Sequence, residues 1–280
     1  MSMLKRLSVF CAVVLALAAC SHNNDGDATT TAAPAPVVTP AVVTPAVAAP
    51  AVSVVAPAAP RGDDTSATAA TPFVDNGQWV EGRDYSVIDA GSRLTDTDKI
   101  EVVEAFSYGC PACNAYHPTM KELVQAMPPG VVAAYLPASF MPQENWVTLQ
   151  RAYYAAQALG VAEKANDAMY DAVWSTHELS AENASGTGLK PADALPTLQD
   201  IAQVYARFGA DPTNFVAVAN SFAVNLKMKR ADDMMKAYGV DGTPNLIING
   251  KYRINPLQLG DMKKSIALTR YLVAREAVGK

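Results

Sequence analysis

The segment that most constrains the fold of this chain is the Cys-Pro-Ala-Cys motif at residues 110–113. The apolar run before it, residues 100–106, has the length and composition of a buried β-strand. The run after it, residues 111–127, places Met120, Leu123, Val124 and Met127 at helical spacing. The motif therefore joins a predicted strand to a predicted helix.

Pro111 fits the first position of this helix, because proline lacks the N–H group that would have no partner there. Cys110 is then predicted at the helix N-terminus, where unpaired N–H groups and the helix dipole favour a thiolate and lower the pKa. Cys113 follows one helical turn later and is placed to close a disulfide with Cys110. The motif thus indicates thiol–disulfide chemistry.

The first twenty residues are typical of an export signal. Lys5 and Arg6 precede an apolar run at residues 7–19, which is too short to span a bilayer but suits the core of a signal peptide. The run ends in Leu-Ala-Ala-Cys, which resembles the bacterial lipobox. That resemblance implies cleavage before Cys20, a lipid on Cys20 as the only membrane attachment and, since serine rather than aspartate follows, a weak preference for the outer membrane. Ordinary secretion is the alternative.

The cysteine count supports a catalytic motif. Of the four cysteines, Cys11 would leave with the signal peptide and Cys20 would be acylated, so only Cys110 and Cys113 remain as thiols. This excludes a framework of structural disulfides, although an exported protein would permit one. A zinc site would need two further ligands. The histidines of the chain are His22, His117 and His177.

Composition divides the rest of the chain in two. Residues 21–72 are almost entirely Ala, Pro, Val, Thr, Ser and Asp, and recurring prolines predict a disordered, extended tether. Residues 73–280 are long enough for one sizeable core. The formal net charge of the whole chain is −5 and no basic patch is visible, so nucleic acid is not an expected partner.

The folded part reads as an α/β domain with a helical insertion. Strands are predicted at residues 85–88 and 131–136, and Asn249-Gly250 between two strand-like runs predicts a hairpin. A mainly helical stretch at about 143–238 separates the two halves, and a last helix is predicted at 260–277. The helical segments expected within the stretch are 146–159, 162–174, 192–208 and 212–235.

This chain resembles the thioredoxin superfamily, and within it the DsbA-like periplasmic disulfide oxidoreductases. The resemblance rests on the order of elements over 73–280, the Cys-Pro-x-Cys motif, Thr243-Pro244 before the hairpin, the wording Ile-Asn-Gly-Lys-Tyr at 248–252, and Pro118 in the first helix. It implies a thioredoxin fold with an inserted all-helical subdomain. It also implies no cofactor beyond the redox-active disulfide.

The resemblance carries roles to matching positions. Cys110 would be the exposed nucleophile and Cys113 the buried partner, while Pro244 would be a cis-proline facing the disulfide. Thr243 would present its backbone to an extended substrate, next to the motif residues Pro111 and Ala112.

Glu104, six residues before Cys110, matches a buried acid that exchanges protons with the inner thiol. An ionised carboxyl is costly within an apolar strand, so its pKa should rise towards a useful range. The alternative is a solvated position at a strand edge.

Two departures from the family pattern bear on redox strength. Oxidising DsbA proteins carry histidine where this chain has Ala112, and a strand-borne lysine of the family is replaced within residues 132–134, Val-Ala-Ala. Both changes remove positive character near Cys110. We therefore expect its pKa to be less depressed than the ~3.5 of a strongly oxidising DsbA.

Other candidates have simpler interpretations. His117 could touch the inner thiol or a copper ion, but a histidine on a helix is more often a surface or packing residue. Tyr153, Tyr154 and Tyr170 are expected to pack in the core rather than to bind a ligand.

The sequence thus predicts a lipid-anchored protein of the Gram-negative periplasm that oxidises thiols of exported proteins through Cys110 and Cys113. Reoxidation by a membrane quinone-linked partner of the DsbB type is implied by the family alone. One alternative is a reductase or isomerase that uses the same pair. Another, of a different class, is a module in which Cys110, Cys113 and His117 bind Cu(I).

Overall fold

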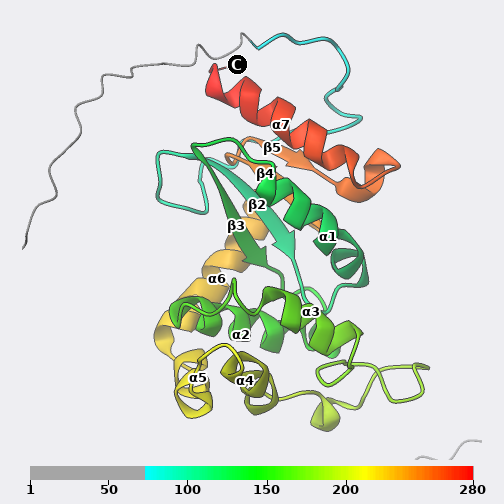
Figure 1. The fold of residues 1–280 in the computed structure, drawn as a ribbon, viewed down its shortest axis with the longest axis vertical. Coiled ribbons are helices and arrows are strands. Elements are labelled where there is room, and N and C mark those ends of the chain that lie inside the picture. Colours follow the sequence, from blue (N-terminus) through cyan, green and yellow to red (C-terminus); the bar gives the residue numbers. More distant parts are fainter. Residues whose placement is uncertain (1–72, 280) are drawn as a thin grey trace, which may run out of the picture. The chain divides into compact units, whose positions relative to one another are not determined.

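The computed structural model of this chain describes residues 73–279. Its centre is a five-stranded sheet in the order β1-β5-β4-β2-β3 (Figure 1). Strand β2 runs parallel to β3 and antiparallel to β4, and β5 is antiparallel to both β4 and β1. The strands are β1 Ser86–Val87, β2 Ile100–Phe106, β3 Val131–Pro137, β4 Asn245–Ile248 and β5 Tyr252–Ile254.

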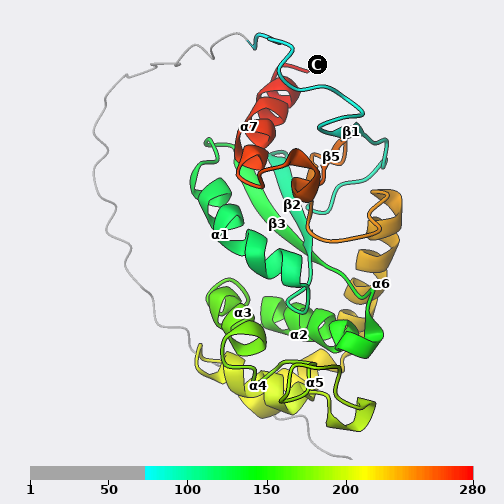
Figure 2. The same ribbon diagram turned by 90° about the vertical axis from the view of Figure 1, so that its right-hand side faces the viewer.

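The described part of the chain has seven α-helices, some of which cover the sheet while others lie beyond one end of it. Figure 2 shows α1 and α7 on one side of the sheet and α6 on the other. Helices α2, α4 and α5 pack on one another and form the inserted helical subdomain together with α3. The helices are α1 Pro111–Gln125, α2 Trp146–Ala158, α3 Asn166–Trp174, α4 Leu198–Ala206, α5 Pro212–Ala219, α6 Phe222–Ala237 and α7 Lys264–Ala277. This is the predicted α/β fold with a helical insertion.

Strand β2 is buried because neighbouring strands flank both its edges and apolar side chains cover both its faces. Val102 contributes to a core with α1 and α7, while Val103 contributes to a core with the inserted helices. This two-sided burial explains why the run is nearly continuous in apolar residues rather than alternating. The predicted strand at 100–106 is confirmed residue for residue.

The hairpin between β4 and β5 forms at Asn249 and Gly250, as predicted. Both residues have positive φ angles, 52° and 68°, which is the geometry of a two-residue type I′ turn. Gly250 is also required by space, since a Cβ atom there would lie 2.7 Å from the carbonyl oxygen of Ser92.

The prediction of one helix at 212–235 is wrong. The structure divides this stretch into α5 and α6, and the Ser221 side chain caps α6 by accepting a hydrogen bond from the N–H of Val224. The segment at 192–208 is also divided. There Thr197 and Asp200 form a capping box that starts α4 at Leu198.

Three other elements are shorter than predicted. The strand expected at 85–88 covers Ser86–Val87, the helix expected at 162–174 begins at Asn166, and the last helix begins at Lys264.

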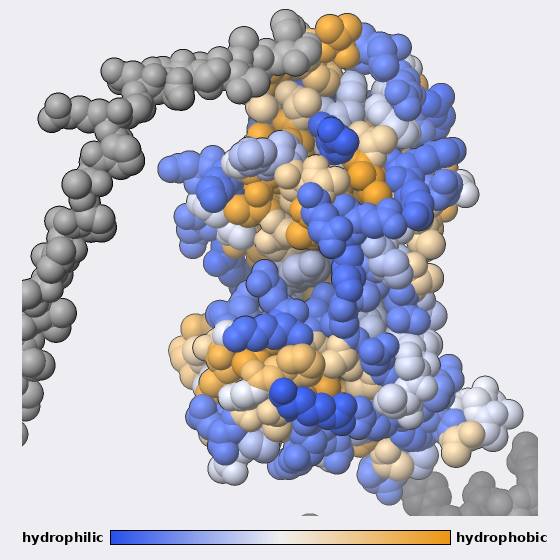
Figure 3. All heavy atoms as spheres, in the orientation of Figure 1, coloured by the Kyte–Doolittle hydropathy of each residue, from blue (hydrophilic) through white to orange (hydrophobic). Residues whose placement is uncertain are grey.

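The predicted signal peptide at 1–20, its Cys20 and the tether at 21–72 lie outside the described residues and stay predictions. Within residues 73–279, no helix combines the length and apolar composition that crossing a membrane requires. On the face drawn in Figure 3, hydrophobic residues gather in an upper and a lower area with hydrophilic residues between them.

Candidate active site

Cys110 caps the N-terminus of α1, as predicted. The chain leaves β2 at Phe106 and turns through a hydrogen bond from the Cys110 N–H to the carbonyl of Ser107 (3.1 Å), and Pro111 then starts the helix. The Cys110 sulfur accepts a hydrogen bond from the N–H of Cys113 at 3.3 Å. The strand therefore delivers this thiol to free N–H groups of a helix end, which stabilise a thiolate.

The two thiols of the motif have opposite acidities. Hydrogen bonding from Cys113 is the main cause that lowers the pKa of Cys110 to about 6, with smaller help from Thr243 and backbone N–H groups against the opposing effect of burial. Burial raises the pKa of Cys113 well above its usual value, and the nearby Cys110 raises it further. Both are free thiols in this structure. At neutral pH, therefore, Cys110 carries the negative charge and Cys113 keeps its proton.

The loop before β4 completes the site opposite the helix N-terminus. The peptide bond between Thr243 and Pro244 is cis, as the resemblance implied. The carbonyl oxygen of Thr243 lies 3.4 Å from the Cys110 sulfur and accepts a hydrogen bond from its S–H when that thiol is protonated. The Asn245 side chain donates to the carbonyl of Gly242 at 2.9 Å and so holds the loop.

Glu104 lies inside the protein, and the alternative of a solvated strand edge is wrong. Glu104 is 2 % exposed. It lies on β2, the strand that pairs with β3 on one side and with β4 on the other. Its Oε1 atom has no hydrogen-bond partner among the described residues. Burial, with a smaller contribution from the charge of Cys110, raises the pKa of Glu104 to about 8. The carboxyl group is therefore mostly protonated at neutral pH.

Tyrosines, rather than a lysine, surround Glu104. In the sheet register Glu104 pairs with Tyr135 of β3, and the two preceding positions of that strand are Ala133 and Ala134. The pKa values of Tyr116, Tyr135 and Tyr170 are raised chiefly by burial and further by Glu104. Among the residues described, no Lys or Arg contributes to the pKa shift of Glu104. The departure noted in the sequence thus leaves this acid without a cationic partner.

The sequence pattern did not indicate that two tryptophans, Trp146 and Trp174, lie at the site. Trp174 Nε1 donates to the carbonyl of Tyr108 at 2.8 Å and fixes the turn before the motif. Trp146 approaches the same turn so closely that a Cβ atom on Gly109 would lie 2.7 Å from its indole nitrogen. Their distance from the motif in sequence, and the dependence of both contacts on the packed insertion, explain why the sequence pattern did not indicate them.

His117 does not join the thiols. Its ring stacks on Tyr170 with 4.4 Å between ring centroids, and its Nε2 atom pairs with Asp167 at 2.7 Å. In the part of the chain that the structure describes, no three His, Cys, Asp or Glu side chains are placed to share a metal ion. The geometry therefore favours the packing interpretation of His117 over the Cu(I) site. Tyr153, Tyr154 and Tyr170 are buried, as expected of core residues.

An acidic thiol at a helix N-terminus, a buried second thiol one turn later and a cis-proline loop define the class of thiol:disulfide oxidoreductases with a thioredoxin fold. Residues 101–264 match the family model described as the DSBA-like thioredoxin domain, and this chain belongs to that family.

Known proteins agree with this assignment. The thiol:disulfide interchange protein DsbA of Pseudomonas aeruginosa is 29% identical over 198 residues, which cover 71% of this chain and 86% of the relative. DsbA of Pseudomonas syringae pv. tomato is 29% identical over 211 residues, covering 75% and 88%.

Solved structures give the same picture. The crystal structure of Pseudomonas aeruginosa DsbA has a TM-score of 0.61 at 28% identity and covers 72% of this chain and 97% of its own. The structure of the oxidoreductase DsbA from Xylella fastidiosa also has a TM-score of 0.61, at 29% identity, and covers 71% and 98%.

Proposed function

We propose that this thiol:disulfide oxidoreductase donates a disulfide to thiols of exported proteins through Cys110 and Cys113. The observation that carries the proposal is the asymmetry of the two thiols: the pKa of Cys110 is lowered to about 6, whereas that of Cys113 is raised. A disulfide transfers outward when its outer sulfur leaves as a stable thiolate. The relatives that match this chain are named thiol:disulfide interchange proteins, which supports the same chemistry.

The reaction begins from the oxidised pair. A substrate thiolate attacks the Cys110 sulfur, a mixed disulfide forms, and the bond to Cys113 breaks with its electron pair left on the Cys113 sulfur. A second substrate thiolate then attacks the substrate's own sulfur in the mixed disulfide, and Cys110 leaves as a thiolate. The substrate loses two electrons, and the Cys110–Cys113 pair gains them.

Glu104 supplies and receives the proton of the inner thiol in this scheme. When Cys113 leaves as a thiolate in a buried site, its pKa favours rapid protonation. The carboxyl group of Glu104 is protonated at neutral pH because its pKa is about 8, and its nearness to the inner thiol is seen in its effect on the pKa of Cys113. During reoxidation the transfer runs in reverse.

Substrate contact is assigned to the surface around Cys110. Pro111 and Ala112 lie at the start of α1, and Thr243 and Pro244 lie opposite them. The N–H and carbonyl groups of the Thr243 segment would pair with an extended substrate backbone.

The cellular setting follows from the resemblance and the first seventy-two residues. We infer a periplasmic protein of a Gram-negative bacterium, anchored through a lipid on Cys20 and separated from the membrane by a tether at 21–72. A quinone-linked membrane partner of the DsbB type would reoxidise the pair. The redox-active disulfide needs no external cofactor.

The reduction potential decides the direction of transfer. We expect the full chain, equilibrated in glutathione buffers and read by thiol trapping, to show a potential nearer the about −120 mV of an oxidising DsbA than the about −270 mV of thioredoxin. A potential near the thioredoxin value would overturn the oxidase and leave a reductase that needs an electron donor.

A further inference from the structure

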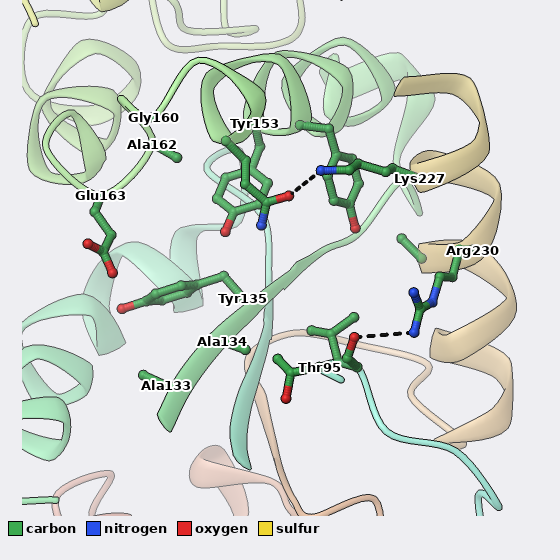
Figure 4. Close-up of a pocket in the computed structure, with 14 residues that line it drawn as sticks. Thr95, Ala133, Ala134, Tyr135, Tyr153, Gly160, Ala162, Glu163, Lys227 and Arg230 are labelled. Carbon is green, nitrogen blue, oxygen red and sulfur yellow. Dashed lines mark hydrogen bonds between the residues drawn. The ribbon is translucent and has the colours of Figure 1, made fainter. Parts of the chain in front are cut away.

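A cavity of about 490 Å³ lies along the free edge of β3 (Figure 4), and neither Cys110 nor Cys113 lines it. We call this cavity the β3 groove. Strand β3 carries its Ala133, Ala134 and Tyr135, α2 contributes Tyr153, and α6 contributes Lys227 and Arg230. In Figure 4 the two cations extend from α6 on one side of β3, and Glu163 lies on the other side. Its size is in the range of cavities that hold small ligands or short peptide segments.

The backbone of β3 is open on the groove side. The strand lies at the end of the sheet order and pairs only with β2. Within residues 73–279, the N–H and C=O groups of residues 132–135 that point away from β2 have no hydrogen-bond partner. Free edges of this kind accept a further strand unless proline, charges, bulges or a covering helix or loop block them. Here Ala133 and Ala134 leave the backbone approachable.

The groove also carries two cations without a carboxylate partner. Lys227 donates to the side-chain oxygen of Gln157 at 2.8 Å, and Arg230 donates to the carbonyl of Leu94 at 3.3 Å. Neither forms an ion pair among the residues described. The neighbouring acid of α6, Asp232, is instead held by hydrogen bonds from Ser139 and Gln150.

Aromatic surface completes the groove. Tyr135 is half-buried, the largely buried Tyr153 and Tyr154 line the groove from α2, and Lys227 lies over the Tyr154 ring at 5.9 Å from its centroid. Such rings bind apolar parts of a chain without requiring one particular side chain. The groove thus combines an unpaired strand edge, aromatic side chains, two cations without a carboxylate partner on its α6 side and one carboxylate, Glu163, on the opposite side.

We propose that the β3 groove binds an extended acidic segment of a polypeptide, which adds to the sheet as a strand beside β3 and directs its carboxylates to Lys227 and Arg230. At ~3.3 Å per residue, three or four residues of such a segment cover residues 132–135. In the setting of the proposed function, on which this point rests, the segment belongs to an unfolded substrate whose cysteines react at Cys110. The groove would then hold the chain and raise the local concentration of its thiols.

The test uses a cysteine-free probe, so that binding is separated from thiol exchange. A fluorescein-labelled peptide with the sequence Thr-Glu-Val-Glu-Thr is titrated with the full chain, and fluorescence polarisation is measured at low and at high salt. We expect the double substitution Lys227→Ala with Arg230→Ala to weaken binding at least tenfold. Lys229→Ala removes a cation of the same helix that is already paired with Asp233, and it should leave the affinity within about twofold.

Strand addition is tested on the peptide. N-methylation of alternate amides removes backbone donors without changing charge, so it should abolish binding if the peptide pairs with β3. Equal affinity of the methylated peptide, or equal affinity of the double variant, overturns the proposal. So does a stable dimer in sedimentation that excludes the probe, because a second copy would then cover the edge.

The proposed function is followed separately with a small two-cysteine peptide that has no acidic residues. All variants should oxidise this peptide at the rate of the unaltered chain. If the unaltered chain does not oxidise the two-cysteine peptide, the proposed function is contradicted and the groove proposal is not. If it oxidises this peptide but does not bind the acidic probe, the groove proposal is contradicted and the function is not.

Discussion

The carbonyl oxygen of Thr243 lies 3.4 Å from the sulfur of Cys110, although 133 positions separate the two residues in the sequence. The whole helical insertion is contained between them. This contact joins the N-terminus of α1 to the loop before β4.

The roles of the two cysteines predict different outcomes for their serine variants. Cys110→Ser removes the nucleophile, so disulfide transfer to a two-cysteine peptide should fall to the uncatalysed rate. Cys113→Ser keeps the Cys110 nucleophile but removes the thiol that can attack the mixed disulfide and release the substrate, so mixed disulfides of Cys110 with a disulfide-bearing peptide should accumulate. Mass spectrometry of acid-quenched reactions measures the adduct. Absence of any adduct with Cys113→Ser would contradict these roles.

Glu104 should make the stability of the reduced protein depend on pH. Its pKa is raised from 4.5 to about 8 in the folded state, so the unfolded chain releases this proton at lower pH than the folded chain does. Burial of this carboxyl group therefore lowers the free energy of unfolding. The reduction is absent below about pH 4.5, grows as the pH rises and is complete above about pH 8. At its full extent it corresponds to about 3–5 kcal/mol.

Glu104→Gln should therefore unfold at higher urea concentration than the unaltered protein at pH 9, and at a similar concentration at pH 4.5. Urea titrations of both reduced proteins at these two pH values measure the difference. A parallel dependence on pH in the two proteins would show that Glu104 is not the buried acid responsible.

The missing histidine of the motif predicts how the redox strength can be increased. The pKa of Cys110 is about 6 in this chain. Ala112→His places a protonatable ring beside Cys110 and should stabilise the Cys110 thiolate further. We expect the pKa of Cys110 to fall by about one unit. The reduction potential should then become about 30 mV more oxidising. Thiolate absorbance against pH and glutathione equilibration measure the two quantities, and a shift of either one in the opposite direction would refute the prediction.

Substitution of Gly109 by alanine is predicted to destabilise the protein. A Cβ atom there would lie 2.7 Å from Trp146 Nε1, so Gly109→Ala should cost about 1–3 kcal/mol of unfolding free energy through overpacking. The matched control is Gly188→Ala, where the nearest atom would lie 3.8 Å away. Urea midpoints compare the two variants. Similar midpoints for both would mean that the turn before the motif yields to the added methyl group.

The sequence was sufficient where local pattern and burial agree. The run at 100–106 is apolar on both faces because both faces are covered, and Asn249-Gly250 specifies its turn through the left-handed φ angles that these residues tolerate. The position of Cys110 at a helix N-terminus followed from Pro111 in the same way. Glu104 was expected to be a buried acid because its position matches one in the family that the chain resembles, and its burial in the structure agrees.

Long-range packing explains what the sequence did not reveal. The break between α5 and α6 depends on the Ser221 cap, which interrupts no apolar pattern. Tyr116, Tyr135 and Tyr170 meet around Glu104 from three different elements, and Trp146 reaches Gly109 only after the insertion has packed. The spacing of residues along one helix or strand carries no information about contacts between different elements.

The place of the insertion in the chain has a consequence for biosynthesis. A polypeptide that is made and folds from its N-terminus presents Cys110 and Cys113 long before Thr243 exists. During that interval the two thiols have no loop opposite them and no finished sheet behind them, because β4 and β5 are still to come. Until its last third has been synthesised, the nascent chain is an ordinary cysteine-bearing polypeptide, open to oxidation by copies that are already complete.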